Sequence, residues 1–303
     1  MRCDRASTIA LINHPKYNQN KDLLTDAARI AEGNIRRHFE YAIILDLSVA
    51  LARSVVEPHI PQLLKTQRAN GLWKIEDAER KSFWLLAALN HSTLLEGLRN
   101  ERAFRHDPYM PFQESSDLYG YVIRRDFSHT LVDTDNRLKS NLVSEILDAQ
   151  ETDGSWGHTI VVTCKRLEEL HLLSEPNRYE RIQKAAEWLF STYNPDMVGF
   201  HVGVPYGIPA HDMFSTSNRW AEFESALKER PDWDPKQLCY NHLAIIQNGI
   251  ALQTLIQLGY QDDERIIKAC DNLFTLKEKF GGWCQSNITQ GVAYKRLAGI
   301  GNT

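Results

Sequence analysis

The sequence predicts an all-α protein made of helical hairpins that repeat along the chain. One phrase, a helix followed by glutamine, glycine and tryptophan, occurs at Gln67–Trp73 and again at Gln150–Trp156, with 83 residues between equivalent positions. Apolar residues recur with the helical period between these phrases. A repeat of this kind indicates a two-helix unit that is stacked on itself.

Two weaker copies of the phrase end at Phe200 and at Trp283, and 83 residues again separate them. Lys277 stands where the glutamine of the last copy is expected. Adjacent copies are unequally spaced, because only 44 residues separate Trp156 from Phe200. We therefore expect a unit of about 40–45 residues, typical of two-helix repeats, with loops of variable length.

The elements follow from local signals. Residues 21–33 form the first predicted helix, with Asp22 near its start and Gly33 as its stop signal. Pro58 and Pro61 open a later helix, since proline is tolerated in a first helical turn. The predicted hairpins, in order, cover residues 41–51 with 58–67, 82–89 with 138–150, 159–170 with 177–189, 241–255 with 262–276, and a last helix at about 288–297. The sequence gives no signal for a strand hairpin.

The Gln-x3-Gly-x-Trp phrases resemble the QW repeats of the terpene cyclase and protein prenyltransferase superfamily, over roughly residues 35–300. This resemblance implies a single α/α-toroid domain over 1–303, of about four to five helix pairs around an apolar-aromatic cavity. The first helix of each pair would be inner and the second outer. Glutamine at a helix end can satisfy backbone groups, and tryptophan can pack over the next repeat. The phrase residues are therefore expected to be scaffold.

The predicted ring is irregular. The chain ends after the first half of a fifth hairpin, so helix 21–33 closes the ring, the ring stays open, or another subunit, such as a second copy, completes it. Insertions at about 100–135 and 199–238 are rich in aromatic residues. One interpretation is that they cap the ring and bury their own aromatic side chains. The other is that they form the mouth or lid of the cavity.

The resemblance implies a protein that binds or cyclises an isoprenoid or polyprenyl substrate, as an isomerase or lyase. Class II terpene cyclases protonate an alkene with an Asp-x-Asp-Asp motif. The nearest match places Asp133 and Asp135 as catalytic candidates, but Asn136 replaces the last aspartate and the match opens a helix predicted to be outer. The family position aligns with 157–159, which holds no carboxylate. A helix N-cap explains the same letters, as it does for Asp262–Glu264.

Prenyltransferases hold zinc with aspartate, cysteine and histidine, and here the corresponding alternative set is Cys239, His242 and Cys284. Buried free cysteine is common as a small apolar residue, so we predict no metal and no cofactor, with zinc or magnesium as alternatives. Pocket candidates lie at the openings of predicted inner helices. These residues are His38, Glu40, Tyr41, Arg80, Lys81, Trp84, His158, Thr163, Tyr240, Asn241, His242, Thr289 and Tyr294.

Composition narrows the partners. A net charge of −4 and a pI near 6.3 argue against nucleic acid, and we interpret Arg36–Arg37 and Arg124–Arg125 as solvated faces. Five irregularly spaced cysteines predict no disulfide framework. Met1–Arg5 is polar and precedes no apolar signal segment, and no stretch reaches the ~18 apolar residues of a membrane span. We expect a cytoplasmic protein.

Two other functions fit the same scaffold: a non-catalytic binding or assembly protein, and a carbohydrate-active lyase or hydrolase. An isoprenoid site should be dry and aromatic with one buried carboxyl group. A sugar site should be rich in paired carboxylates and amides. An assembly protein should expose an apolar patch.

Overall fold

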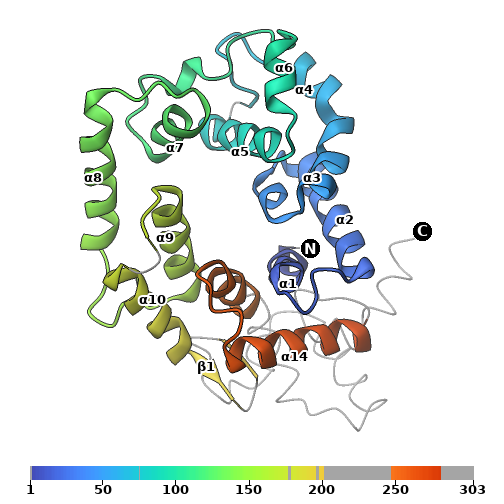
Figure 1. Cartoon of the computed structure of the whole chain (residues 1–303), viewed down its shortest axis with the longest axis vertical. Coiled ribbons are helices and arrows are strands. Elements are labelled where there is room, and N and C mark those ends of the chain that lie inside the picture. The colour runs from blue at the N-terminus through green and yellow to red at the C-terminus, as the bar shows by residue number, and fades with distance from the viewer. Residues whose placement is uncertain (1, 75, 177–178, 196–197, 201–246, 281–303) are drawn as a thin grey trace, which may run out of the picture. The chain divides into compact units, whose positions relative to one another are not determined.

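A computed structural model describes residues 2–74, 76–176, 179–195, 198–200 and 247–280, and it is mostly helical (Figure 1). The all-α class is therefore confirmed. Within these ranges the strands are one antiparallel pair, β1 (Tyr193–Asn194) and β2 (Gly199–Phe200). None of the described helices is long and apolar enough to cross a bilayer. The ring of helix pairs and its single domain stay predictions.

The chain divides into two compact units. Unit 1 contains Met1–Asn18, Gln150–Leu167 and Asn177–Thr303, and unit 2 contains Gln19–Ala149 and Glu168–Pro176. Unit 1 is therefore discontinuous, because its first segment and its last segment come from opposite ends of the chain.

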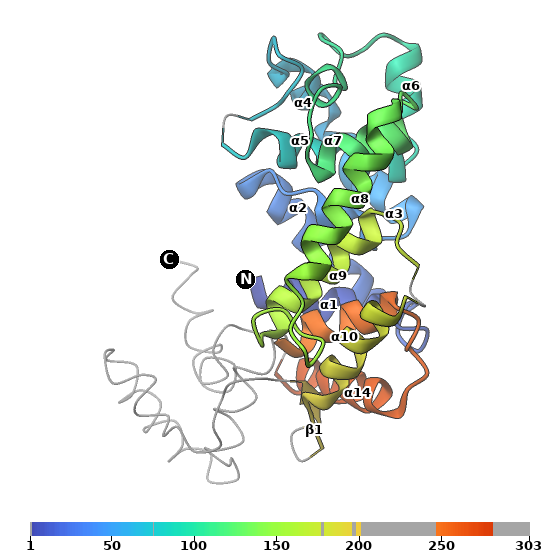
Figure 2. The ribbon, with the colours of Figure 1, turned by 90° about the vertical axis from the view of Figure 1, so that its left-hand side faces the viewer.

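Unit 2 is a succession of short helices followed by one long one, α8, which Figure 2 shows as a continuous rod. Its elements are α2 (Lys21–His38), η1 (Ala42–Asp46), α3 (Val49–Val56), η2 (Glu57–His59), α4 (Ile60–Thr66), α5 (Ala78–His91), α6 (Leu95–Asn100), η3 (Met110–Phe112), α7 (Leu118–Val122), η4 (Ile123–Phe127) and α8 (Asp133–Asp148). The helix α9 (Ile160–Leu172) contributes its last residues to this unit.

The first predicted helix is longer than expected, since α2 continues through Gly33 to His38. The helix ends where Phe39 adopts a left-handed backbone, with φ of 55°, and donates its N–H to the carbonyl of Ile35. Gly33 instead leaves room for Arg37, whose Nε donates to the Gly33 carbonyl at 3.1 Å. A glycine inside a helix is thus tolerated, and the stop prediction at Gly33 is wrong.

The predicted helix over 41–51 is also divided. Its first part is the 3-10 turn η1, and α3 begins anew after Ser48, whose hydroxyl accepts the N–H of Leu51 at 3.4 Å. Serine side chains favour such N-cap positions. The division leaves Ile43 and Ile44 fully buried.

The first insertion buries most of its aromatic side chains. Tyr109, Phe112 and Tyr121 are at most 5% exposed, and Phe104 lies edge-on to the Trp73 ring at 6.0 Å. This supports the interpretation of the 100–135 segment as a cap rather than as an open mouth. The second insertion, 199–238, lies outside the described residues except for Gly199 and Phe200.

Unit 1 contains a helix that the sequence did not predict, α1 (Arg2–Asn13). It packs against α14 (Glu264–Phe280), near the opposite end of the chain, as Figure 1 shows. Other elements are α10 (Glu180–Ser191) and the helical residues 247–257. The polar start Met1–Arg5 concealed this helix, because its apolar residues begin only at Ala6.

The two clear repeat turns have the same hydrogen bonds in their respective units. Gln67 Nε2 donates to the Gly71 carbonyl at 3.1 Å and to the His106 carbonyl at 2.9 Å. Gln150 Nε2 donates to the Gly154 carbonyl at 2.8 Å and to the Arg181 carbonyl at 2.9 Å. Each amide thereby closes its own turn and attaches a later segment.

The tryptophans of these turns are fixed in parallel ways. The backbone N–H of Trp73 donates to the Ser82 hydroxyl at 3.2 Å, and that of Trp156 donates to the Thr163 hydroxyl at 3.0 Å. Trp73 Nε1 also donates to the Leu63 carbonyl at 2.9 Å. Both indoles are at most 4% exposed. The phrase residues are scaffold, as their pattern predicted.

Glycine is required in each turn. Gly71 has φ of 82°, and a Cβ there would lie 2.5 Å from the Asp107 carbonyl oxygen. Gly154 has φ of 97°, and its Cβ would lie 2.5 Å from the Lys184 carbonyl oxygen. The backbone of a later segment therefore approaches too closely for any side chain.

We expect Gly71→Ala and Gly154→Ala each to lower the free energy of unfolding by about 2–3 kcal/mol, since backbone strain and a backbone clash add. Chemical denaturation followed by circular dichroism measures the change. Gly97→Ala is the matched control: its Cβ meets nothing within 4 Å inside α6, so it should be neutral or stabilise by about 0.5–1 kcal/mol. Equal effects at Gly71 and Gly97 would contradict the close approach.

Candidate functional site

Asp135, one of the two predicted catalytic acids, is held in a buried ion pair with Arg124. Their side chains are 3% and 5% exposed, and Arg124 Nη2 lies 2.6 Å from Asp135 Oδ1. Arg124 Nε lies 3.1 Å from both carboxylate oxygens. Asp135 Oδ2 also accepts the backbone N–H of Val132 at 2.9 Å, which caps the first turn of α8. The predicted capping role is thus exerted from the third helical position rather than from the N-cap.

The rest of the Arg124 guanidinium is bound by the insertion itself. Nη1 donates to the carbonyls of Phe112 at 2.5 Å and Ser115 at 2.9 Å, with Gln113 at 3.3 Å. Arg124 lies in η4, a π-helical turn. Its side chain therefore connects η3, the following loop and α8.

This environment determines the protonation of the acid. Hydrogen bonds from Arg124 lower the pKa of Asp135, and they outweigh burial, which acts in the opposite direction. The carboxylate is ionised at neutral pH and has no proton to give. Asp133, two residues earlier, is exposed in the first turn of α8.

The burial of Arg124 overturns one expectation from the sequence. We interpreted Arg124–Arg125 as a solvated face, and this is wrong, because Arg124 is 4% exposed. Arg125 lies over the Tyr121 ring at 5.3 Å and donates to the Leu172 carbonyl at 2.9 Å. No repeat or motif in the insertion marks either arginine as buried, so the sequence offered no signal for this pair.

A second group of charged residues converges at the start of α5, and we call Glu40, Asp77, Arg80 and Tyr119 the Arg80 cluster. Arg80 Nη2 lies 2.8 Å from Glu40 Oε1, and its Nε donates to Asp77. Glu40 and Arg80 were both predicted at openings of inner helices, and the structure brings them together.

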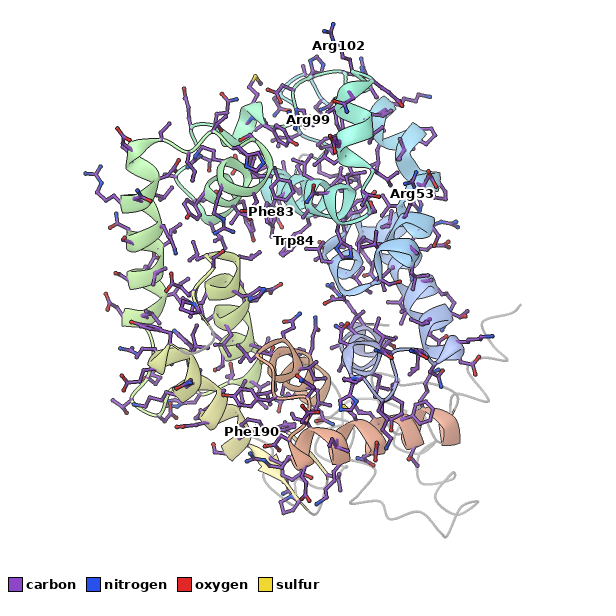
Figure 3. The ribbon with its side chains drawn as sticks, in the orientation of Figure 1. Arg53, Phe83, Trp84, Arg99, Arg102 and Phe190 are labelled. Carbon is purple, nitrogen blue, oxygen red and sulfur yellow. The ribbon has the colours of Figure 1, made fainter. Side chains whose placement is uncertain are left out.

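Aromatic rings lie beside this cluster. The Phe83 ring lies 4.9 Å from the Tyr119 ring and 6.4 Å from the Phe127 ring, and Figure 3 shows Phe83 and Trp84 side by side on α5. Burial raises the pKa of Tyr119 to about 12, so its phenol stays protonated at neutral pH. Arg80 is already paired with two carboxylates, which leaves the phenol as the hydrogen-bond donor of this group.

The other described pocket candidates occupy different environments. Tyr41 is 1% exposed and Trp84 is 8% exposed, so both belong to the core of unit 2. Burial raises the pKa of Tyr41. His38 is exposed at the end of α2. His158 is exposed in unit 1, where its Nδ1 lies 3.0 Å from Asp153 Oδ2.

The group of Asp153, Ser155 and His158 is a local turn and not a catalytic triad. His158 Nδ1 faces both Asp153 Oδ2 and Ser155 Oγ, at 3.0 Å and 3.2 Å. A triad needs one ring nitrogen for each partner. Burial acts to raise the pKa of Asp153, but hydrogen bonds from Ser155 and His158 lower it overall.

Asp262–Glu264 behaves as the sequence predicted. The carboxylate of Asp263 accepts the N–H of Arg265 at 2.9 Å and pairs with its guanidinium at 2.8 Å, at the start of α14. Hydrogen bonds from Arg265 lower the pKa of Asp263 despite its burial. These interactions are those of a helix cap.

Several predicted site residues lie outside the described ranges: Tyr240, His242, Tyr294, Cys239 and Cys284. The alternative zinc set is among them. Within the part of the chain that the structure describes, no three His, Cys, Asp or Glu side chains group as metal ligands would. Both described cysteines, Cys164 and Cys270, are buried thiols.

A search of family models, of curated proteins and of solved structures finds no match to this chain.

We expect Asp135→Asn to lower the free energy of unfolding by about 3 kcal/mol, because it leaves the Arg124 charge buried without its counter-charge. Asp133→Asn, at an exposed position in the same turn, should change it by less than about 0.5 kcal/mol. Denaturant titration of both variants measures the difference. Equal stabilities would mean that the pair contributes nothing beyond its amide equivalent.

The same pair predicts a pH dependence. The pKa of Asp135 is lower in the folded state than in the unfolded chain, so its stabilisation is present above the unfolded value of about 4 and is lost as the pH falls through the folded value. Stability measured from pH 6 to pH 2 should fall less steeply in Asp135→Asn than in the wild type. Parallel curves would contradict a lowered pKa.

Proposed function

We propose that this chain binds an isoprenoid, or a similarly elongated apolar molecule, on a scaffold of the terpene-cyclase type, and that neither Asp133 nor Asp135 protonates it. The proposal has two parts, the ligand class and the absence of acid chemistry at this turn. They rest on different observations.

The ligand class is supported by the repeat turns. Gln67 and Gln150 make equivalent hydrogen bonds to their own turns and to later segments, as expected of the QW repeats that the sequence resembles. This support is an analogy between scaffolds, since one fold can carry many functions.

The absence of acid chemistry is supported by the electrostatics of Asp135, and this observation carries the proposal. Protonation of an alkene needs a strong, protonated carboxylic acid in a dry site. Asp135 is dry but ionised, because Arg124 and the N–H of Val132 both stabilise its charge. Asp133 is in contact with solvent, which is unfavourable for a strong alkene-protonating acid.

The experiment is to incubate the full chain with linear isoprenoids and with their diphosphates, and to analyse bound and released molecules by mass spectrometry. We expect intact isoprenoid to be retained and no cyclised product to form, in the wild type and in Asp133→Asn alike. A cyclised product that disappears in Asp133→Asn would restore the acid role of this residue. If no isoprenoid is retained, the ligand class is wrong.

A carbohydrate-active function is the second candidate, and the Arg80 cluster favours it. It combines two carboxylates, a guanidinium and a protonated phenol beside aromatic rings. Sugar sites use such groups, with rings that stack on the sugar and acids that transfer protons. Retention of a neutral oligosaccharide by the wild type, weakened in Tyr119→Phe, would favour this candidate over the isoprenoid.

A further inference from the structure

The N-terminal segment Arg2–Asn18 is joined to unit 1 by its side chains, although 230 or more residues separate it from the helices that it contacts. Ile9, Ala10 and Leu11 of α1 are fully buried. The backbone of α1 comes so close to residues 247–257 that a Cβ on Gly249 would lie 2.7 Å from the Ser7 nitrogen. The segment is therefore packed as part of the core of this unit.

A polar group fastens the end of this segment to α14 and the turn before it. Asp271 accepts hydrogen bonds from the Tyr17 hydroxyl at 2.5 Å and from Lys16 Nζ at 2.7 Å. The ring of Tyr17 stacks on Phe274 at 4.8 Å. His14 Nε2 lies 3.1 Å from the carbonyl of Gln261.

These contacts cover a thiol. Cys270 is fully buried, and it lies one helical turn before Phe274, on the same face of α14. Burial raises the pKa of Cys270 to about 12, and the charge of Lys16 acts on it in the opposite direction. Lys16 and Tyr17 thus lie on the side of α14 that carries this cysteine.

We propose that the segment Arg2–Asn18 is a clasp that opens as a unit while the rest of the chain stays folded, and that its opening exposes Cys270. A helix of twelve residues is marginal without a partner, so the released segment unfolds instead of persisting as a helix. Terminal elements with few local contacts are the parts of proteins that open below the global unfolding free energy. The clasp converts this opening into a change from an unreactive thiol to a reactive one.

Iodoacetamide alkylation of the native full chain tests the proposal, with each cysteine followed by peptide mass spectrometry. The thiolate displaces iodide, so the rate reports how often the thiol is exposed. Cys164 in α9 is the internal reference, since it is buried but belongs to a helix outside the clasp. We expect Cys270 to react much more slowly than a free thiol, yet faster than Cys164.

Variants of the clasp should change only one of the two rates. Ile9→Ala should raise the alkylation rate of Cys270 by roughly 30-fold or more, and Tyr17→Phe by roughly tenfold, with Cys164 unchanged. Leu189→Ala in α10 and Tyr193→Phe are the matched controls in the same unit, outside the clasp. They should leave the ratio of the two rates as it is in the wild type.

Two results would overturn the proposal. If Ile9→Ala and Tyr17→Phe raise the rates of Cys270 and Cys164 together, the segment leaves only when the whole chain unfolds. If neither variant changes the ratio of the rates, the segment does not control access to Cys270. Circular dichroism of each variant before alkylation shows whether the helices remain folded.

Discussion

The buried pair of Arg124 and Asp135 is the interaction on which the candidate site region depends. Removing both charges from water is costly, and such a pair is tolerated only when the remaining donors and acceptors are satisfied. Here the carbonyls of Phe112, Gln113 and Ser115 bind the guanidinium, and the N–H of Val132 binds the carboxylate. The pair therefore organises a segment that has no repeat and little regular structure to stabilise it.

This arrangement also limits the chemistry. The carboxylate that neutralises Arg124 is the one that caps α8, so both its charge and its oxygen atoms are used structurally. A group can act as a strong acid only if its surroundings favour the protonated form. The surroundings of Asp135 favour the charged form, and the resemblance of its sequence to an acid motif does not carry over into its electrostatics.

The repeat turns could be predicted from the sequence because their cause is local. Glutamine, glycine and tryptophan each have a role fixed by a few neighbouring residues, and these residues recur at a constant interval. Gly33 shows the limit of local signals: the same residue type that ends many helices lies inside α2, and the left-handed Phe39 ends it instead. The left-handed backbone of a bulky residue has no sequence signature.

The site was less predictable than the fold, because its partners are joined by non-local contacts. The sequence placed Asp135 at a helix start, but Arg124 lies in the insertion, where no period indicates which residues face inward. It likewise placed Glu40 and Arg80 at helix openings without showing that they pair. The helix α1 was missed because its polar first turn resembles an unstructured terminus, and its partners are the last described helices.

The discontinuity of unit 1 has a consequence for synthesis. The residues of α1 leave the ribosome first, whereas the residues that cover them, 247–274, leave it near the end. At elongation rates of about 5–20 residues per second, the apolar face of α1 waits for roughly 10–50 seconds without its native partner. Chaperones and premature association with other nascent chains therefore compete for this face during translation, and pauses late in the message would lengthen that competition.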